Sequence, residues 1–218
     1  ASELYNARGP GIQLANMPNL RGLLYSSGEI TGTPDEGLLF TRGYAQPICS
    51  PTRATILTGR QTYQHGVGNP NPDNILPASE ETFPEIISRA APRYELASFG
   101  KWHLGSGNTG PRDRGGGPNF SGTLQGGVQD YNSWNRIKIE DGVVVDSGTS
   151  ITSLVADGVY TSPYATSVQI DEAVSFIETR GASPWVVWMG FNAPHDPFHD
   201  PPAELAPEGG FSTTGASN

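Results

Sequence analysis

The longest apolar run of the chain, Trp185–Phe191 (W-V-V-W-M-G-F), sets the strongest limit on the fold. The run is far too short to cross a bilayer, so it predicts a β-strand, and its unbroken apolar character predicts a central strand buried on both faces. Residues 163–180 precede it and carry apolar residues at helical spacing, which predicts an amphipathic helix packed on the sheet. The predicted apolar face consists of Tyr164, Val168, Ile170, Val174 and Ile177.

The same alternation of helix and strand recurs elsewhere in the chain. Thr82 and Glu85 form the pattern of a capping box, which predicts a helix start, and residues 94–99 follow as a short strand. Residues 136–145 predict a β-hairpin with an Asp-Gly turn. Alternating helices and strands indicate an α/β fold, here a three-layer mixed sheet with helices on both faces.

Composition narrows the possible functions. A chain of 218 residues is long enough for one good-sized domain, and its 28 glycines and 19 prolines indicate short elements joined by long loops. The net charge of -9 and the absence of Lys/Arg runs exclude a nucleic-acid-binding surface. The single cysteine excludes internal disulfides. We expect no transmembrane segment, and residues 1–5 lack the character of a signal peptide.

The only cysteine lies in the segment 48–60, which reads I-C-S-P-T-R-A-T-I-L-T-G-R. Ser50 is a good N-cap and Pro51 suits the first helical position, so Cys49 is predicted just before a helix N-terminus, where the macrodipole favours negative charge. Arg53 in the first turns opposes that dipole, so we expect it to have a local anionic partner. A lone cysteine beside a helix start is otherwise most often a small buried side chain.

Two further segments place basic side chains at strand ends. Lys101 and His103 lie in G-K-W-H-L-G, which follows the predicted strand 94–99, and residues i and i+2 at a strand end point to the same side. An ammonium and an imidazole there could bind the same anion, although alone the pair would be read as solvated surface. His195 follows the strand 185–191 in N-A-P-H, at the edge where open α/β sheets place their sites.

Together these segments resemble the type I sulfatases, which share the alkaline-phosphatase-like fold. C-S-P-T-R matches their C-x-P-x-R signature, G-K-W-H-L-G is their second signature, and N-A-P-H-D-P is similar to a third element. The resemblance covers most of residues 17–203, including a helix opening at Pro18 and a strand over 37–41. It implies a catalytic domain, incomplete at both ends, over residues 1–203, with 204–218 as a tail or the start of a continuation.

The resemblance also implies a chemistry. A formylglycine-generating enzyme would convert Cys49 to formylglycine, whose hydrated aldehyde is the nucleophile toward a small-molecule or carbohydrate sulfate ester. Arg53 would hold the hydrate, and Lys101 and His103 would bind sulfate oxygens. His195 would contact the sulfate and help to protonate the departing alcohol, a task suited to an imidazole.

A divalent cation, usually Ca²⁺, is the last implied component. Modified Cys49 would be one metal ligand, and the family takes the others from an upstream Asp pair and a downstream element. Because the chain has no Asp before Asp35, we expect the remaining ligands to lie outside it.

Two other functions stay open at this point. One is a truncated, catalytically silent chain that acts in binding or self-association, since a missing strand leaves unpaired sheet edges. The other is a phosphonate or phosphate ester hydrolase with the same nucleophile. Export, to the periplasm or out of the cell, is expected from the resemblance alone.

Overall fold

The structure is a computed structural model, and it describes residues 43–69, 75–106, 110–114, 117–152 and 162–205, with 19, 22–24 and 37 as isolated residues. The chain divides into one unit of Ala1–Ala45 with Ala203–Asn218 and a second unit of Gln46–Pro202. In the first unit the structure describes a short 3₁₀ helix, η2 (Ala203–Leu205). The predicted helix from Pro18 and strand 37–41 fall almost wholly outside the described residues. None of the described helices is long and apolar enough to cross a membrane.

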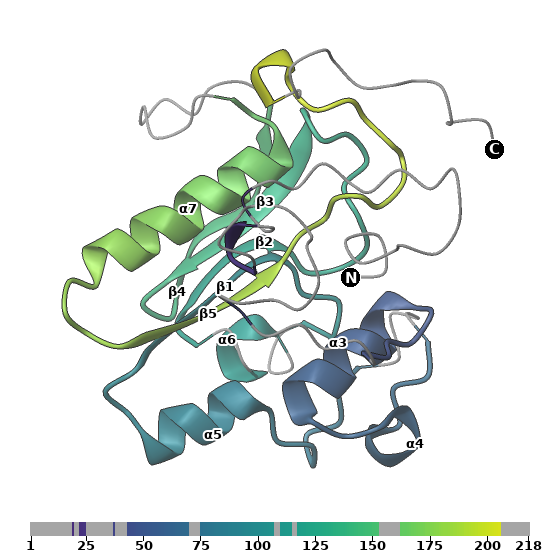
Figure 1. Ribbon diagram of the computed structural model, residues 1–218, viewed down its shortest axis with the longest axis vertical. Coiled ribbons are helices and arrows are strands. Elements are labelled where there is room, and N and C mark those ends of the chain that lie inside the picture. Colours follow the sequence, from purple (N-terminus) through teal and green to yellow (C-terminus); the bar gives the residue numbers. More distant parts are fainter. Residues whose placement is uncertain are drawn as a thin grey trace. The chain divides into compact units, whose positions relative to one another are not determined.

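A mixed five-stranded sheet forms the centre of the second unit (Figure 1). Its strands are β1 (Glu95–Lys101), β2 (Asn119–Thr123), β3 (Trp134–Glu140), β4 (Val143–Ile151) and β5 (Trp185–Gly190). Their order is β4-β3-β2-β1-β5. Both β2 and β5 run parallel to β1, whereas β3 and β4 are antiparallel to their neighbours. The carboxyl ends of β1, β2 and β5 therefore meet at one edge of the sheet.

Helices cover both faces of this sheet (Figure 1). On one face lies α7 (Ala165–Thr179), whose Phe176 packs with Phe99 of β1 in one apolar cluster. On the other face are α3 (Cys49–Thr58), α4 (Thr62–His65), α5 (Phe83–Ala90) and α6 (Pro111–Arg114). There Leu57 of α3 packs with Trp102 and Phe120 in a second cluster. The predicted three-layer α/β architecture with a mixed sheet is confirmed.

Local sequence signals set several element boundaries. The predicted capping box is present at α5, where Thr82 N donates to Glu85 Oε2 at 2.8 Å and Glu85 N donates to Thr82 Oγ1. The predicted hairpin is β3–β4, and its turn places Asp141 at φ 47° and Gly142 at φ 81°. Positive φ at both central residues is the type I′ pattern that an Asp-Gly pair favours.

The prediction of a fully buried central strand at 185–191 is wrong for the described part of the chain. Among the described strands β5 pairs only with β1, so it lies at the edge of the sheet. Its Trp185 is 43% exposed, and the following residues to Met189 are half-buried. Among the described residues no strand pairs with the edge of β5 that faces away from β1, so the side chains of β5 stay partly exposed.

The predicted apolar face of α7 is also partly wrong. The helix has the predicted period, but Ile170 and Val174 are exposed, 43% and 45% respectively. Two polar side chains, Gln169 and Glu172, are buried instead. Each has a polar partner on the sheet side: Gln169 donates to Asn192, and Glu172 pairs with Arg136. In α7 these specific polar contacts, and not the apolar pattern alone, determine which residues are buried.

Candidate active site

Cys49 is the first residue of α3, so the helix begins two positions earlier than the predicted start at Pro51. The predicted N-cap role of Ser50 is wrong, because the N-cap is Ile48 and Ser50 Oγ instead donates to the carbonyl oxygen of His103 at 2.8 Å. That bond ties the start of α3 to the segment after β1. The Cys49 side chain is partly exposed, at a helix N-terminus where unpaired N–H groups favour an anion.

Lys101 and His103 converge on the cysteine. His103 Nδ1 lies 3.1 Å from Cys49 Sγ, and Lys101 Nζ lies 3.8 Å from the same sulfur. Strand alternation is not the cause of this convergence, because His103 lies beyond the end of β1 with φ 60°. A left-handed non-glycine residue is uncommon and is held here by its surroundings, since His103 N donates to the carbonyl of Leu124 at 2.9 Å.

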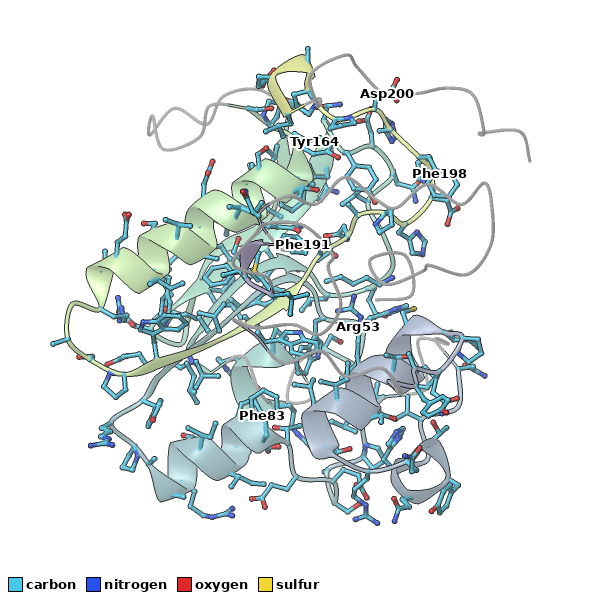
Figure 2. The ribbon with its side chains drawn as sticks, in the orientation of Figure 1. Arg53, Phe83, Tyr164, Phe191, Phe198 and Asp200 are labelled. Atoms are coloured by element: carbon cyan, nitrogen blue, oxygen red, sulfur yellow. The ribbon has the colours of Figure 1, made fainter. Side chains whose placement is uncertain are left out.

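Arg53 lies on α3 (Figure 2), the helix that begins with Cys49. Its guanidinium Nη1 donates to the backbone carbonyl of Lys101. Gly190 makes room for this contact, because a Cβ at that position would lie 2.6 Å from Arg53 Nη1 and 2.8 Å from the Lys101 oxygen. In the described part of the chain no carboxylate forms an ion pair with Arg53. Burial lowers the pKa of Arg53 and the charge of Cys49 acts in the opposite direction, so the local anionic group beside Arg53 is the cysteine.

Burial and mutual repulsion shape the charges of these groups. Burial lowers the pKa of Lys101, and this shift is partly offset by Cys49; burial also lowers the pKa of Arg53. Burial, together with the charges of Lys101 and Arg53, lowers the pKa of His103 to about 4. The imidazole of His103 is therefore neutral at neutral pH, beside the buried Lys101 and the half-buried Arg53.

Two buried N–H groups near Gly190 lack a hydrogen-bond acceptor among the described residues. Arg53 Nε and Trp188 Nε1 are both buried and have no partner among the described residues. Both side chains border the space above Gly190, where a Cβ would lie 3.2 Å from Trp188 Nε1. A cation and an imidazole beside the sulfur, with the Arg53 guanidinium held on the Lys101 carbonyl, suit a bound oxyanion, whose oxygens accept several hydrogen bonds.

His195 follows β5, at the same carboxyl edge of the sheet, and does not contact Cys49 directly. Its side chain is 43% exposed, and Nδ1 lies 2.7 Å from the carbonyl oxygen of Asp196. Its charge contributes to the lowered pKa of His103, which places it in the same neighbourhood. The structure thus brings Cys49, Lys101 and His103 into contact, with Arg53 held against the Lys101 backbone and His195 beside the group.

These residues do not fit a calcium ion. Ca²⁺ takes six to eight oxygen ligands, whereas the groups around Cys49 are an ammonium, a guanidinium and an imidazole. Across the described ranges no group of three or more His, Cys, Asp or Glu side chains could hold a metal ion. No step of the chemistry below is therefore assigned to a metal.

Sequence reasoning missed the side chains that support this edge of the sheet. Asn192, Gln169 and Tyr131 form hydrogen bonds around the His195 segment, as described below. The only signal for Gln169 was a polar residue inside an apolar helical pattern. A cavity of about 290 Å³ lies elsewhere, between α7 and the strands, where Phe99, Ser121 and Phe176 are among its lining residues. None of the predicted site residues lines it.

Comparison with known proteins adds an independent line of argument. The family profile described as Sulfatase matches residues 11–218. N-acetylgalactosamine-6-sulfatase of Rattus norvegicus is 28% identical over 190 residues, covering 75% of this chain and 34% of that protein. N-acetylglucosamine-6-O-sulfatase of Bacteroides thetaiotaomicron is 30% identical over 175 residues, covering 78% of this chain and 26% of that protein.

Solved structures show the same fold. The crystal structure of Ps i-CgsB in complex with k-i-k-neocarrahexaose superposes with a TM-score of 0.51 at 21% identity, covering 69% of this chain and 36% of that chain. The present chain spans about a third of the length of the first curated relatives it matches. With a profile that matches nearly its whole length, and with Cys49, Lys101 and His103 in contact at the sheet edge, the chain belongs to the sulfatase family.

Proposed function

We propose that the protein hydrolyses sulfate monoesters of carbohydrates, with a nucleophile derived from Cys49. One observation carries this proposal: Lys101 Nζ and His103 Nδ1 lie 3.8 and 3.1 Å from Cys49 Sγ, and no carboxylate in the described residues pairs with Lys101 or Arg53. Cys49 and, more weakly, Asp196 act on the charge of Lys101, but no carboxylate of the described residues lies within ion-pair distance of it. A buried cation without such a partner is costly, so the site is best satisfied by an anion that arrives with the substrate.

Each residue has a task that its position supports. As formylglycine, residue 49 supplies a hydrated aldehyde. One of its hydroxyls, which loses its proton, attacks sulfur while the bond between sulfur and the sugar oxygen breaks. Loss of the proton of the second hydroxyl then expels sulfate and restores the aldehyde, which water hydrates again. Lys101 donates to a sulfate oxygen and balances its charge, while His103, neutral at neutral pH, donates or accepts one hydrogen bond beside it. Arg53 holds the hydrate at residue 49, and the position of the Arg53 guanidinium depends on its hydrogen bond to the Lys101 carbonyl. His195, partly exposed, is placed to protonate the departing sugar oxygen.

The substrate class follows from two relatives. One is named for the 6-sulfate of N-acetylgalactosamine and the other for the 6-O-sulfate of N-acetylglucosamine. We therefore propose a 6-sulfated amino sugar, free or in a polymer, as the first substrate to test.

Three accompanying parts belong to this proposal. A formylglycine-generating enzyme acts on Cys49, and calcium is bound by carboxylates outside the described residues. The protein works outside the cytoplasm, in the periplasm or secreted.

The test is sulfate release by the complete protein, supplied with calcium, from 4-nitrophenyl sulfate and from the 6-sulfates of both amino sugars. We expect turnover by the wild type and none by Cys49→Ala. Ile56→Ala is the matched control, because Ile56 lies on the same helix and is 54% exposed, away from the site. Equal sulfate release by wild type and Cys49→Ala would refute the proposal. Faster hydrolysis of the matched phosphonate ester would reassign the substrate class while retaining the nucleophile.

A further inference from the structure

Three buried polar side chains link α7, the segment after β5 and the end of β2. Gln169 Nε2 donates to Asn192 Oδ1 at 2.6 Å, and Asn192 Nδ2 donates to Thr123 Oγ1 at 3.1 Å. Gln169, Asn192 and Thr123 are 0%, 3% and 9% exposed. Buried amides are costly unless paired, so each of these bonds fixes the orientation of the next side chain.

Thr123 also holds the segment that carries the catalytic Lys101 and His103. Its carbonyl oxygen accepts from Trp102 N at 2.9 Å, and the next carbonyl, that of Leu124, accepts from His103 N at 2.9 Å. Thr123 therefore contacts both segments of the site: its carbonyl oxygen accepts from Trp102 N, next to His103, and its hydroxyl oxygen accepts from Asn192 Nδ2.

Asn192 transmits this position to His195. The Asn192 carbonyl oxygen accepts from His195 N at 3.0 Å, and Tyr131 Oη donates to the His195 carbonyl at 2.8 Å. The backbone is thus fixed on both sides of His195. Gly127 faces the imidazole, since a Cβ there would lie 2.8 Å from His195 Nδ1. The imidazole itself contacts Asp196, whose backbone oxygen lies 2.7 Å and whose Oδ1 lies 3.1 Å from Nδ1. The backbone bonds fix the segment that carries it.

We propose that Thr123 and Asn192, supported by Gln169, are positioning residues that align His195 with Cys49, Lys101 and His103. The kinetic consequence rests on the function proposed above, whereas the structural consequence does not. Without the Thr123 hydroxyl, Asn192 Nδ2 loses its acceptor and the link between the two histidine-bearing turns is broken at one defined atom.

The experiment uses the complete protein, four single variants at Thr123, Ser121 and His195, the double variant Thr123→Val/His195→Gln, and Gln169→Met for a second readout. Thr123→Val removes the hydroxyl at nearly constant shape, and Thr123→Ser restores it. Ser121→Ala is the matched control: Ser121 lies on the same strand, is 1% exposed, and its hydroxyl has no partner among the described residues. His195→Gln removes the imidazole. In that background a residue that acts only by positioning His195 should have no further effect on kcat.

For sulfate release we expect Thr123→Val to lower kcat about 10- to 100-fold with KM nearly unchanged, as misplacement of a catalytic group does. Thr123→Ser recovers most of this loss, and Ser121→Ala stays close to wild type. In the His195→Gln background, adding Thr123→Val changes kcat by less than about 2-fold, because coupled residues are not additive. An undiminished loss in that background would overturn the proposal.

A second readout needs no turnover. In protein labelled with ¹⁵N-histidine, the imidazole signals of His195 are identified by their loss in His195→Gln. We expect Thr123→Val to shift them, Thr123→Ser to return them, and Ser121→Ala to leave them in place. Gln169→Met, which removes the donor to Asn192 Oδ1 without altering β2, must also shift them.

Unchanged His195 signals in folded Thr123→Val or Gln169→Met would overturn the proposal. A wild type that releases no sulfate would refute the proposed function. The imidazole signals of His195 would still decide whether Thr123 and Asn192 are positioning residues. If Thr123→Val does not fold, Gln169→Met alone decides it.

Discussion

Two regions of the same domain bury cationic side chains, and their charges are balanced in opposite ways. In the first, Arg136 is 8% exposed and lies between Asp146 at 3.0 Å and Glu172 at 2.9 Å, both also buried. In the second, Arg53 and the 2%-exposed Lys101 lie beside Cys49, and no carboxylate of the described residues forms an ion pair with either.

The difference separates a structural charge from a functional one. Desolvating a cation costs free energy in both places. Around Arg136 that cost is offset inside the protein, by two carboxylates from β4 and α7. Around Cys49 it is left to a ligand, and burial lowers the pKa values of both Lys101 and Arg53. Loss of a group from the first region should therefore cost stability, and loss from the second should cost activity.

The largest effect is expected for Arg136→Met. It leaves Asp146 and Glu172 buried without their main cation, and breaking a buried pair in this way costs about 3–5 kcal/mol. Lys138, 3.8 Å from Glu172, favours the lower end of that range. Urea unfolding measures the loss. Arg112→Met is the matched control, since its ion pair with Asp113 is exposed and should be worth about 0–1 kcal/mol. Equal losses in the two variants would contradict the assignment.

The next largest effect is expected for Arg53→Met, which should cost much activity and little stability. Removing a cation that serves the bound oxyanion should lower kcat/KM for a sulfate ester about 10²- to 10³-fold. Stability should change by less than about 1.5 kcal/mol, because one hydrogen bond to the Lys101 carbonyl is lost while an unpaired cation is relieved of burial. If Arg53→Met were as unstable as Arg136→Met and still active, the two regions would have exchanged roles.

The smallest effect concerns the pH dependence of the first region. Burial alone would raise the pKa of Asp146, but hydrogen bonds from Thr149, Gly148 and Arg136 outweigh it and lower that pKa. A lowered carboxylate pKa stabilises the fold above the unfolded value of about 3.9, and the stabilisation is lost as the pH falls through the folded value.

Asp146→Asn should accordingly lose about 1.5–3 kcal/mol at pH 7. The gap to wild type should narrow below about pH 4, and urea unfolding across pH 3–7 would measure it. A constant difference over that range would show that the charge of Asp146 has no role.

Signals that act over a few residues were readable from the sequence. The capping box of Thr82 and Glu85 and the Asp141-Gly142 turn depend on local hydrogen bonds and backbone geometry, and both are found. The alternation of helices and strands likewise predicted the layers of the α/β fold. The convergence of Lys101 and His103 was expected, but its actual cause, a left-handed His103 held by the Leu124 carbonyl just after β2, was not.

Features that depend on distant partners were not readable. Ser50 satisfies every rule for an N-cap, yet its hydroxyl goes to His103 O, far along the chain. The buried face of α7 includes Gln169 because its side-chain amide donates to Asn192 Oδ1 on the sheet side. Likewise, the apolar β5 sequence predicts two covered sides, but it cannot say which strand is its neighbour.

The central claim, that Cys49 is the source of a catalytic nucleophile, is tested most directly by the mass of one tryptic peptide. The peptide of residues 43–53 (GYAQPICSPTR) contains Cys49 and should be isolated from complete protein that releases sulfate. We predict the mass of an aldehyde or its hydrate in place of the thiol at Cys49. A peptide that keeps its thiol in every molecule of an active preparation would contradict the account.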